Sequence, residues 1–223
     1  MVVCALIAAF NEEAHIADVV AGAARHVSSV VVVDDGSVDA TAARARAAGA
    51  VVLRHQANLG KGCAIRTGLG YALQRPCSNI LFLDADLQHD PAEIPLLVAR
   101  AAEGRGDFVL AERAFKRDTM PAGRFYSNVI GSAILSQLIG VQVADTQSGF
   151  RLVRAGLLRN LKLTGTGYEI DTEILIKVIR AGAEIDLVKV QRLQYAGTSS
   201  QVRLLRDSLR TGMLAVGYRY LSA

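Results

Sequence analysis

The sequence predicts an α/β fold in which a mostly parallel sheet is flanked by helices. Short apolar runs alternate with helical segments, as in consecutive βαβ units. The runs are continuously apolar rather than alternating, which is typical of strands buried on both faces. Three consecutive runs also end in polar, acidic sequences, and in open α/β sheets the ligand crevice lies at such carboxyl ends.

The first half of the chain shows this alternation most clearly. The apolar runs predict strands at Val2–Ala9, Val30–Val33, Val51–Leu53, Ile80–Leu83 and Phe108–Ala111. We expect Asn11 to cap a first helix that extends to about His26, with Glu12 and Glu13 in its first turn, where the helix dipole favours acidic residues. Further helices are expected over Val38–Ala48, after Asn58-Leu59-Gly60-Lys61-Gly62 as far as about Pro76, and over Ala92–Glu103. Gly49 would close the first of these and Asp90 would cap the last.

The pattern is looser after residue 115. Helices are expected at Ala122–Ile139 and Glu169–Ala181, and a strand at Ile185–Leu193. The tail from Gln201 to Tyr220 is expected to be helical, with one basic stripe formed by Arg203, Arg206 and Arg210. This stripe either contacts an anionic partner or is simply a solvated face.

Composition limits the class of protein. The 223 residues are 51% hydrophobic, which is enough to bury the core of a single domain. The net charge is +4, and the basic surplus lies in residues 150–223, where 12 Lys and Arg stand against 6 Asp and Glu. This surplus suggests a phosphate-bearing or membrane-surface partner; we expect no nucleic-acid partner.

Cysteine usage and hydropathy predict a cytoplasmic protein. Cys4, Cys63 and Cys77 are odd in number and lack the C-x-x-C spacing, so we expect a reducing compartment, no disulfide and no zinc site. The start of the chain has no basic segment typical of a signal peptide. Residues 129–144 are apolar but interrupted by polar residues and too short to span a membrane.

The most informative stretch is Asp84-Ala85-Asp86, followed by Gln88, at the end of a predicted buried strand. Two carboxylates at i and i+2 point in the same direction and offer hard oxygen ligands that suit Mg²⁺ or Mn²⁺. An ordinary acidic turn before the next helix is the alternative. Gly60-Lys61-Gly62 lacks the P-loop spacing, and no G-x-G-x-x-G opens the first helix, so neither nucleotide fingerprint is present.

Five motifs occur in an order that resembles a known family. They are Ala8-Ala9-Phe10-Asn11-Glu12, Val33-Asp34-Asp35-Gly36-Ser37, Asn58-Leu59-Gly60-Lys61-Gly62, Asp84-Ala85-Asp86 and Ser148-Gly149-Phe150-Arg151. The set resembles glycosyltransferase family 2, which has a GT-A (Rossmann-like) fold, and within it the dolichyl- or polyprenyl-phosphate mannose or glucose synthases. The sequence departs from that family at Ala8, where Pro is usual, at Phe10, where Tyr is usual, and at Gln201, where a Lys is common.

The resemblance implies a role for each motif. It places the donor nucleotide sugar at Ala8, Phe10, Glu12, Asp34, Asp35, Lys61, Asp84 and Ala85. It implies a Mg²⁺ or Mn²⁺ ion at Asp84, Asp86 and Gln88. It implies an acceptor site at Arg113, Arg124, Ser148 and Arg151. The residues expected to act in catalysis are Asp86, Arg113, Arg124 and Arg151. Lys61 could instead be a solvated loop residue, and Glu12 could simply sit in a helical first turn.

These roles define the expected reaction. We expect inverting, metal-dependent transfer of a hexose from GDP-mannose or a UDP-hexose to a polyprenyl or dolichyl phosphate. A phosphate monoester is largely a dianion at neutral pH and needs no strong general base. The enzyme would be peripheral at the cytoplasmic membrane face. We expect one domain over residues 1–223, with a nucleotide-sugar-binding half (1–115) and an acceptor half (116–223) that ends in a C-terminal acceptor-side helical segment.

Three alternatives remain open at this point. The same fold could use a hydroxyl acceptor, a saccharide or a lipid, with Glu169, Asp171 or Glu173 as the base. The protein could be a non-catalytic nucleotide-sugar-binding protein, although the intact Asp84-Ala85-Asp86 motif argues against this. A metal-dependent nucleotidyltransferase would normally carry a Gly-rich, basic loop after the first strand, and Phe10-Asn11-Glu12-Glu13 is not such a loop.

Overall fold

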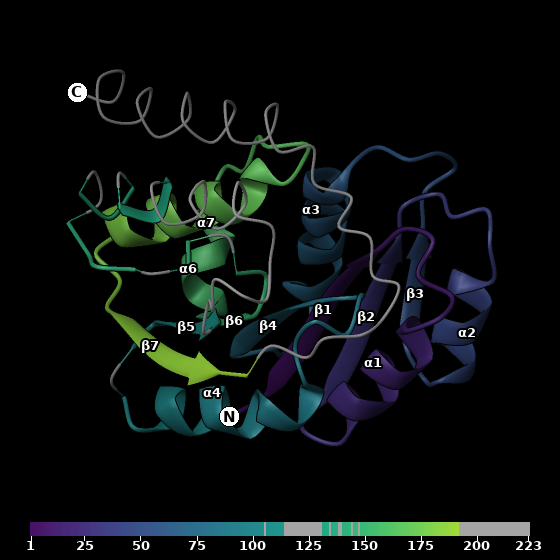
Figure 1. Ribbon diagram of the computed structural model, residues 1–223, viewed down its shortest axis with the longest axis horizontal. Coiled ribbons are helices and arrows are strands. Elements are labelled where there is room, and N and C mark those ends of the chain that lie inside the picture. Colours follow the sequence, from purple (N-terminus) through teal and green to yellow (C-terminus); the bar gives the residue numbers. More distant parts are fainter. Residues whose placement is uncertain are drawn as a thin grey trace, which may run out of the picture.

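Seven strands form one mixed sheet, built from both halves of the chain (Figure 1). The strands are β1 (Val3–Ala9), β2 (Ser29–Asp34), β3 (Val51–Arg54), β4 (Asn79–Asp84), β5 (Phe108–Arg113), β6 (Arg151–Arg154) and β7 (Ile185–Val190). Their order is β3-β2-β1-β4-β6-β5-β7. Strand β6 is antiparallel to β4 and β5, and all other neighbours are parallel. This computed structural model describes residues 1–104, 106–113, 131–133, 135–137, 140–143, 145–146 and 148–191.

Helices cover both faces of the sheet. They are α1 (Ile16–Ala24), α2 (Thr41–Ala47), α3 (Lys61–Ala72), the 3₁₀ turn η1 (Pro91–Glu93), α4 (Ile94–Ala102), α6 (Ala155–Arg159) and α7 (Glu169–Arg180). Helices α1, α2 and α4 pack on one face, and α3, α6 and α7 on the other (Figure 1). The predicted fold class, a mostly parallel sheet flanked by helices, is therefore confirmed.

The core follows the two-residue period of the strands. On β1, Cys4 and Leu6 face α3 and α7, whereas Ala5 and Ile7 face α1 and α4. Both sets are at most 3% exposed, so the strand is buried on both faces, as its continuous apolar run predicts. The parallel register of β1 with β2 and with β4 brings the carboxyl ends of the three strands together.

One prediction about local structure is wrong, and one strand was not foreseen. Asn11 does not cap the first helix, because α1 begins at Ile16 with His15 as its N-cap. Asn11 instead adopts a φ of 55°. Strand β6 was not expected at all, since it is short and carries an arginine at each end. The predicted cap at Asp90 is confirmed: its side chain accepts a hydrogen bond from the backbone N–H of Ala92.

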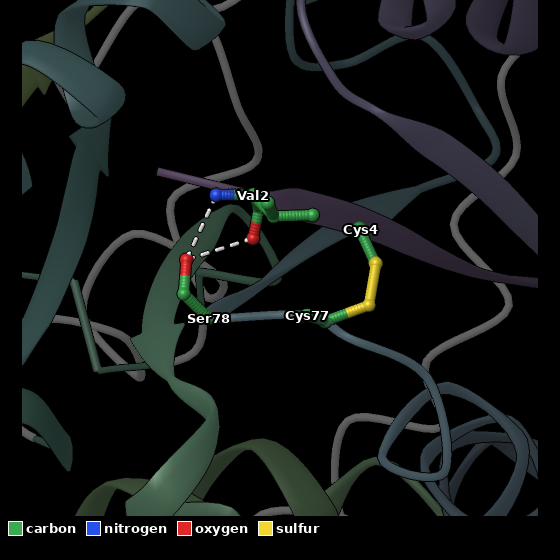
Figure 2. Close-up of a disulfide and its surroundings, with 4 residues drawn as sticks. All are labelled: Val2, Cys4, Cys77 and Ser78. Atoms are coloured by element: carbon green, nitrogen blue, oxygen red, sulfur yellow. Dashed lines mark hydrogen bonds between the residues drawn. A yellow bond between two sulfur atoms is a disulfide. The ribbon is translucent and has the colours of Figure 1, made fainter.

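A disulfide joins Cys4 on β1 to Cys77, which lies just before β4, with a Cα–Cα distance of 5.9 Å (Figure 2). The expectation of three free thiols is therefore wrong, and Cys63 is the free cysteine among the described residues. Cys4 and Cys77 are 3% and 5% exposed, so the disulfide lies in the core. Whether two cysteines near neighbouring strands can form a disulfide depends on the register of β1 and β4, and the number and spacing of the cysteines do not reveal this register.

Several expectations lie outside the described residues. These include Arg124, the tail after residue 191 with its basic stripe, and much of the predicted helix Ala122–Ile139, although residues 131–133 and 135–137 are helical. Within the part of the chain that the structure describes, no helix combines the length and apolar character needed to cross a bilayer.

Candidate active site

The predicted donor-site residues lie along one edge of the sheet. In the register of the parallel strands, Ala8 on β1 pairs with Asp84 on β4, and Ala9 pairs with Asp34 on β2. Phe10 follows Ala9 at the same edge and is partly buried. The structure thus brings together the ends of three strands that the sequence singled out, as expected for a ligand crevice in an open α/β sheet.

Asp35 organises the loop that closes one end of this edge. Its Oδ1 accepts a hydrogen bond from the backbone N–H of Leu59 at 3.0 Å and lies 2.6 Å from His55 Nδ1. Its Oδ2 accepts from the N–H of Gly60 at 2.7 Å. An ionised carboxylate offers about four acceptor positions, so one is left for a ligand such as a nucleobase N–H.

Asp34 and His55 support this arrangement. Asp34 Oδ1 accepts from the N–H of Ser37 at 3.0 Å, and Asp34 Oδ2 pairs with Arg54 at 3.0 Å. His55 Nε2 lies 3.0 Å from Thr67 Oγ1 on α3. The sequence reading missed His55, because a lone histidine after a short strand carries no signal of its partner.

The segment after β1 is held by the loop after β2 rather than by a helix. The backbone N–H of Asn11 donates to Ser37 Oγ at 2.9 Å, and that of Glu12 donates to Thr41 Oγ1 at 2.8 Å. Asn11 Oδ1 accepts from the N–H of Val38. Helix α1 begins at Ile16, so Glu12 precedes the helix, although its carbonyl oxygen accepts a hydrogen bond from the N–H of Ile16 at 2.9 Å.

Glu12 reports on the charge of the site. Burial, together with the carboxylates of Asp86, Asp39 and Asp84, raises the pKa of Glu12 to about 7. Neighbouring carboxylates that raise the pKa of a buried acid mark a region of excess negative charge. Such a region suits a divalent cation, so the donor set present here fits Mg²⁺ or Mn²⁺.

Asp84 and Asp86 stand at the end of β4, on either side of the buried Ala85. Asp86 accepts from the backbone N–H of Gln88 at 3.1 Å and from its side-chain Nε2 at 2.7 Å. Gln88 therefore orients Asp86 through its amide nitrogen, and its amide oxygen is the atom that could coordinate a cation. Leu87 between them has a φ of 57°, a conformation that non-glycine residues rarely adopt and that clusters at functional sites.

The described residues hold no ready-made group of three metal-binding side chains. Two carboxylates completed by phosphate oxygens and water are typical of Mg²⁺ sites in enzymes that act on nucleotides. Asp84 and Asp86 are therefore the residues that would hold the ion, with a bound diphosphate completing the site.

Lys61 is the first residue of α3 and is largely buried. Its Nζ lies 2.7 Å from Asp84 Oδ1 and 2.9 Å from Asp171 Oδ2. Burial by itself would lower the pKa of Lys61, but the carboxylates of Asp171 and Asp84 outweigh it and raise the pKa above its ordinary value. The alternative of a solvated loop lysine is wrong, because the side chain is only 13% exposed.

Arg151 lies beneath the site rather than on its surface. Its side chain is 1% exposed, and its guanidinium donates to the carbonyl oxygen of Asp171 at 2.9 Å and to Asp171 Oδ1. The guanidinium carbon also lies 4.9 Å from the centroid of the Phe82 ring. A direct contact between Arg151 and an acceptor phosphate remains a prediction, and this burial favours an indirect role.

Ser148 and Gly149 form the floor next to the acidic pair. Ser148 is fully buried, and its Oγ lies 3.4 Å from the N–H of Phe150. A Cβ placed on Gly149 would lie 2.2 Å from Asp84 Oδ2 and 2.5 Å from Asp84 Cγ. Only a residue without a side chain leaves room for the carboxylate of Asp84 at this point.

Residues 164–167 form a loop that is hydrogen-bonded to acidic side chains in the N-terminal half of α7. The sequence did not indicate that this loop lies next to the site. Glu173 accepts from the N–H groups of Thr164 and Gly165, and Glu169 accepts from those of Thr166 and Gly167. Burial would raise the pKa of Glu173, but hydrogen bonds from Lys177, Gly165 and Thr164 lower it below its ordinary value.

This loop packs directly against the Gly60-Lys61-Gly62 turn. The N–H of Gly62 donates to the carbonyl oxygen of Thr166 at 2.9 Å. A Cβ on Gly60 would lie 2.3 Å from the same oxygen, and one on Gly62 would lie 2.4 Å from the carbonyl oxygen of Gly165. The two glycines therefore serve a close contact between backbones, which fixes the start of α3 and Lys61 with it.

The side chains of two arginines predicted at the acceptor site lie outside the described residues. The backbone of Arg113 ends β5, paired with Val190 on β7, but its side chain lies outside the described structure. Arg124 lies outside it altogether. Their roles at the acceptor remain predictions.

Comparison with known proteins identifies the family. Residues 4–162 match Glycosyl transferase family 2. An uncharacterised protein of Methanocaldococcus jannaschii is 32% identical over 194 residues, which cover 81% of this chain and 83% of that protein. Undecaprenyl-phosphate mannosyltransferase of Micrococcus luteus is 30% identical over 169 residues, which cover 71% of this chain and 69% of that enzyme.

Solved structures agree with this assignment. Glucosyl-3-phosphoglycerate synthase of Mycobacterium tuberculosis, in complex with Mn²⁺, uridine diphosphate and phosphoglyceric acid, superposes with a TM-score of 0.78 at 25% identity. The match covers 98% of this chain and 78% of that one. The chain therefore belongs to glycosyl transferase family 2 and is a glycosyltransferase with the GT-A fold, of the polyprenyl-phosphate mannose synthase-like subgroup.

Proposed function

We propose that this enzyme transfers a hexose from a nucleotide sugar to a polyprenyl or dolichyl phosphate, with inversion and with a divalent cation. The named relatives support this choice of acceptor, since several are polyprenyl-phosphate sugar transferases by name. Family membership removes the non-catalytic alternative that the sequence alone left open.

The observation that carries the proposal is the state of the three acidic residues of α7. Glu169 and Glu173 accept hydrogen bonds from the backbone of the 164–167 loop, and Asp171 is paired with Lys61 and Arg151. Each carboxylate is thus committed to a structural partner and is at most 6% exposed. A hydroxyl acceptor needs a base to remove its proton, whereas a phosphate dianion does not.

The donor side follows from the sheet edge. In this proposal Phe10 and the loop held by Asp35 receive the nucleoside, and the remaining acceptor position of Asp35 binds an N–H of the base. Asp84 and Asp86 hold the cation, which would neutralise the charge that develops on the leaving nucleoside diphosphate. Lys61, 2.7 Å from Asp84, lies where its ammonium can add positive charge next to that diphosphate.

The two halves of the chain would divide the work. Residues 1–115 would bind the nucleotide sugar, and residues 116–223, with Arg113, Arg124 and Ser148 at the junction, would bind the acceptor phosphate. Because a polyprenyl chain stays in the bilayer, the enzyme would act at the cytoplasmic membrane face as a peripheral protein.

A hydroxyl acceptor is the second candidate. It is favoured by the likeness to glucosyl-3-phosphoglycerate synthase, a structure of which holds glucosyl-3-phosphoglycerate together with uridine diphosphate and Mn²⁺. That likeness is at 24% identity and speaks for the shared fold rather than for a shared acceptor.

A direct assay separates the two candidates. The purified protein is incubated with radiolabelled GDP-mannose, UDP-glucose or UDP-N-acetylglucosamine, each with Mn²⁺ and with either polyprenyl phosphate or 3-phosphoglycerate. We expect label to enter the organic phase only with polyprenyl phosphate. Transfer to phosphoglycerate alone would reject the lipid acceptor, and the Asp86→Asn variant serves as the control for metal-dependent transfer.

A further inference from the structure

Four charged side chains form a chain of alternating sign that runs from the site into the core. Asp84, Lys61, Asp171 and Arg151 have side-chain exposures of 28%, 13%, 5% and 1% in that order. Each neighbouring pair is in direct contact. The outermost member is one of the two carboxylates that would hold the divalent cation.

Lys61 occupies a position that such a cation also needs. Its ammonium lies 2.7 Å from Asp84 Oδ1, so a cation coordinated by Asp84 would meet a positive charge already in place. Two cations at one carboxylate repel each other strongly where the surroundings are partly buried. Lys61 also contacts Asp171 Oδ2 at 2.9 Å, and this second contact does not depend on Asp84.

We propose that Lys61 is the resident counter-ion of Asp84, and that Asp171 is the positioning residue that retains Lys61 when a divalent cation binds Asp84. The inference rests on the metal site of the proposed function. It gives Asp171 a role quite different from that of a general base, since Asp171 acts on the metal site through Lys61 and touches neither substrate nor metal.

The surroundings of Asp171 explain why it can hold Lys61. Arg151 donates both to the main-chain carbonyl of Asp171 and to its carboxylate, so Asp171 is fixed to the core and cannot follow Lys61 outward. Arg151 is itself fixed in β6 and lies over the ring of Phe82.

The backbone of Lys61 is fixed as well. The N–H of Gly62 is bound to the carbonyl oxygen of Thr166, and the aromatic ring of Tyr168 lies 5.5 Å from Lys61 Nζ. When a cation binds Asp84, the ammonium of Lys61 therefore has to give up Asp84 and keep Asp171. Because it already contacts both carboxylates, this needs only a small movement of the Lys61 side chain.

The test measures Mn²⁺ binding by electron paramagnetic resonance of the free ion, with protein stripped by chelator and without nucleotide. Lys61→Met removes the competing charge, and we expect it to tighten Mn²⁺ binding about tenfold. Among the described residues, Asp171→Asn leaves Lys61 with Asp84 as its carboxylate partner, and we expect it to weaken Mn²⁺ binding by a similar factor. In the double variant, Asp171→Asn should have no further effect, so that the double variant binds like Lys61→Met.

This cycle separates the inference from a general electrostatic effect. If the charge of Asp171 acted simply through space, Asp171→Asn would weaken binding equally with and without Lys61, and that result would overturn the inference. Unchanged or weaker binding by Lys61→Met would overturn it too. Should Asp171→Asn fail to fold in a thermal-denaturation control, Asp171→Ser takes its place in the cycle, and Lys61→Met still tests whether Lys61 competes with the cation, because a damaged site loses affinity rather than gaining it.

The same titration distinguishes this inference from the proposed metal site. Mn²⁺ binding that is lost in Asp86→Asn but unaffected by Lys61→Met would reject the role of Lys61 and leave the metal site standing. If neither the wild type nor Lys61→Met binds Mn²⁺, with or without an added nucleoside diphosphate, both the metal site and the role of Lys61 are rejected.

Discussion

Gly149→Ala tests how tightly the site constrains Asp84. The added Cβ would lie 2.2 Å from Asp84 Oδ2 and 2.5 Å from Asp84 Cγ, whereas ordinary contacts begin at 3.4 Å. The carboxylate must therefore move by about 1 Å, and a misplacement of that size can cost on the order of a hundredfold in rate. Rotation of the side chain is not free either, because Lys61 holds Asp84 Oδ1 at 2.7 Å.

We expect Gly149→Ala to lower kcat about a hundredfold and to weaken Mn²⁺ binding, with little change in Tm. Gly149 does not have a positive φ, so the effect comes from the contact and not from backbone strain. Gly70→Ala is the matched control: Gly70 is an exposed residue of α3, and its added Cβ meets nothing within 4 Å. It should keep full activity and gain up to about 1 kcal/mol of stability. Wild-type turnover and Mn²⁺ affinity in Gly149→Ala would refute the argument.

Three further predictions address the metal, the buried acid and the membrane. Asp86→Asn should abolish transfer without a loss of Tm, since Asp86 lies at a strand end; activity that persists in excess chelator would contradict this. The pKa of Glu12 is raised from its ordinary value of 4.5 to about 7 in the folded protein. Between these two pH values the folded protein binds more protons than the unfolded chain, so in chelator the free energy of unfolding should fall as the pH rises from 4.5 through 7. Urea titrations of Glu12→Gln should lack this fall, and identical pH profiles would show that the carboxyl is not perturbed. Binding to anionic liposomes, measured by flotation, should weaken in salt and on alanine substitution of the basic stripe (Arg203, Arg206 and Arg210), by about 1 kcal/mol per residue. Binding that responds neither to salt nor to these substitutions would exclude the stripe as the membrane-docking surface.

The sequence predicts the parts of the fold that depend on local pattern. Continuous apolar runs identified β1, β2, β4 and β5, because a strand buried on both faces excludes polar residues. Parallel pairing then brings the strand ends together, which is why the polar sequences that begin at Phe10, Asp34 and Asp84 could be assigned to one edge of the sheet. The cap at Asp90 could also be predicted, because it joins residues only two positions apart.

What the sequence could not predict depends on contacts between distant residues. Lys61 and Asp171 are 110 positions apart, and nothing near either residue indicates the other. Asn11 has a good capping side chain, yet its oxygen accepts from Val38 on a different loop. The Cys4–Cys77 disulfide likewise requires the register between β1 and β4. In each of these cases the tertiary partner outweighs the local preference.

The position of β6 has a consequence for how the protein is made. Among the described strands, β5 is not paired with β4 and is joined to the rest of the sheet through β6, which is completed at Arg154. While the ribosome is still adding residues 114–150, β5 has neither β6 nor β7 to pair with, and β4 has an open edge. A fragment that stops near residue 115 would therefore expose two unpaired apolar strands and be prone to aggregation. Residues 1–115, the proposed nucleotide-sugar-binding half, are thus not expected to fold as a separate unit, and chimeras of this enzyme should exchange segments beyond β7 rather than between β5 and β6.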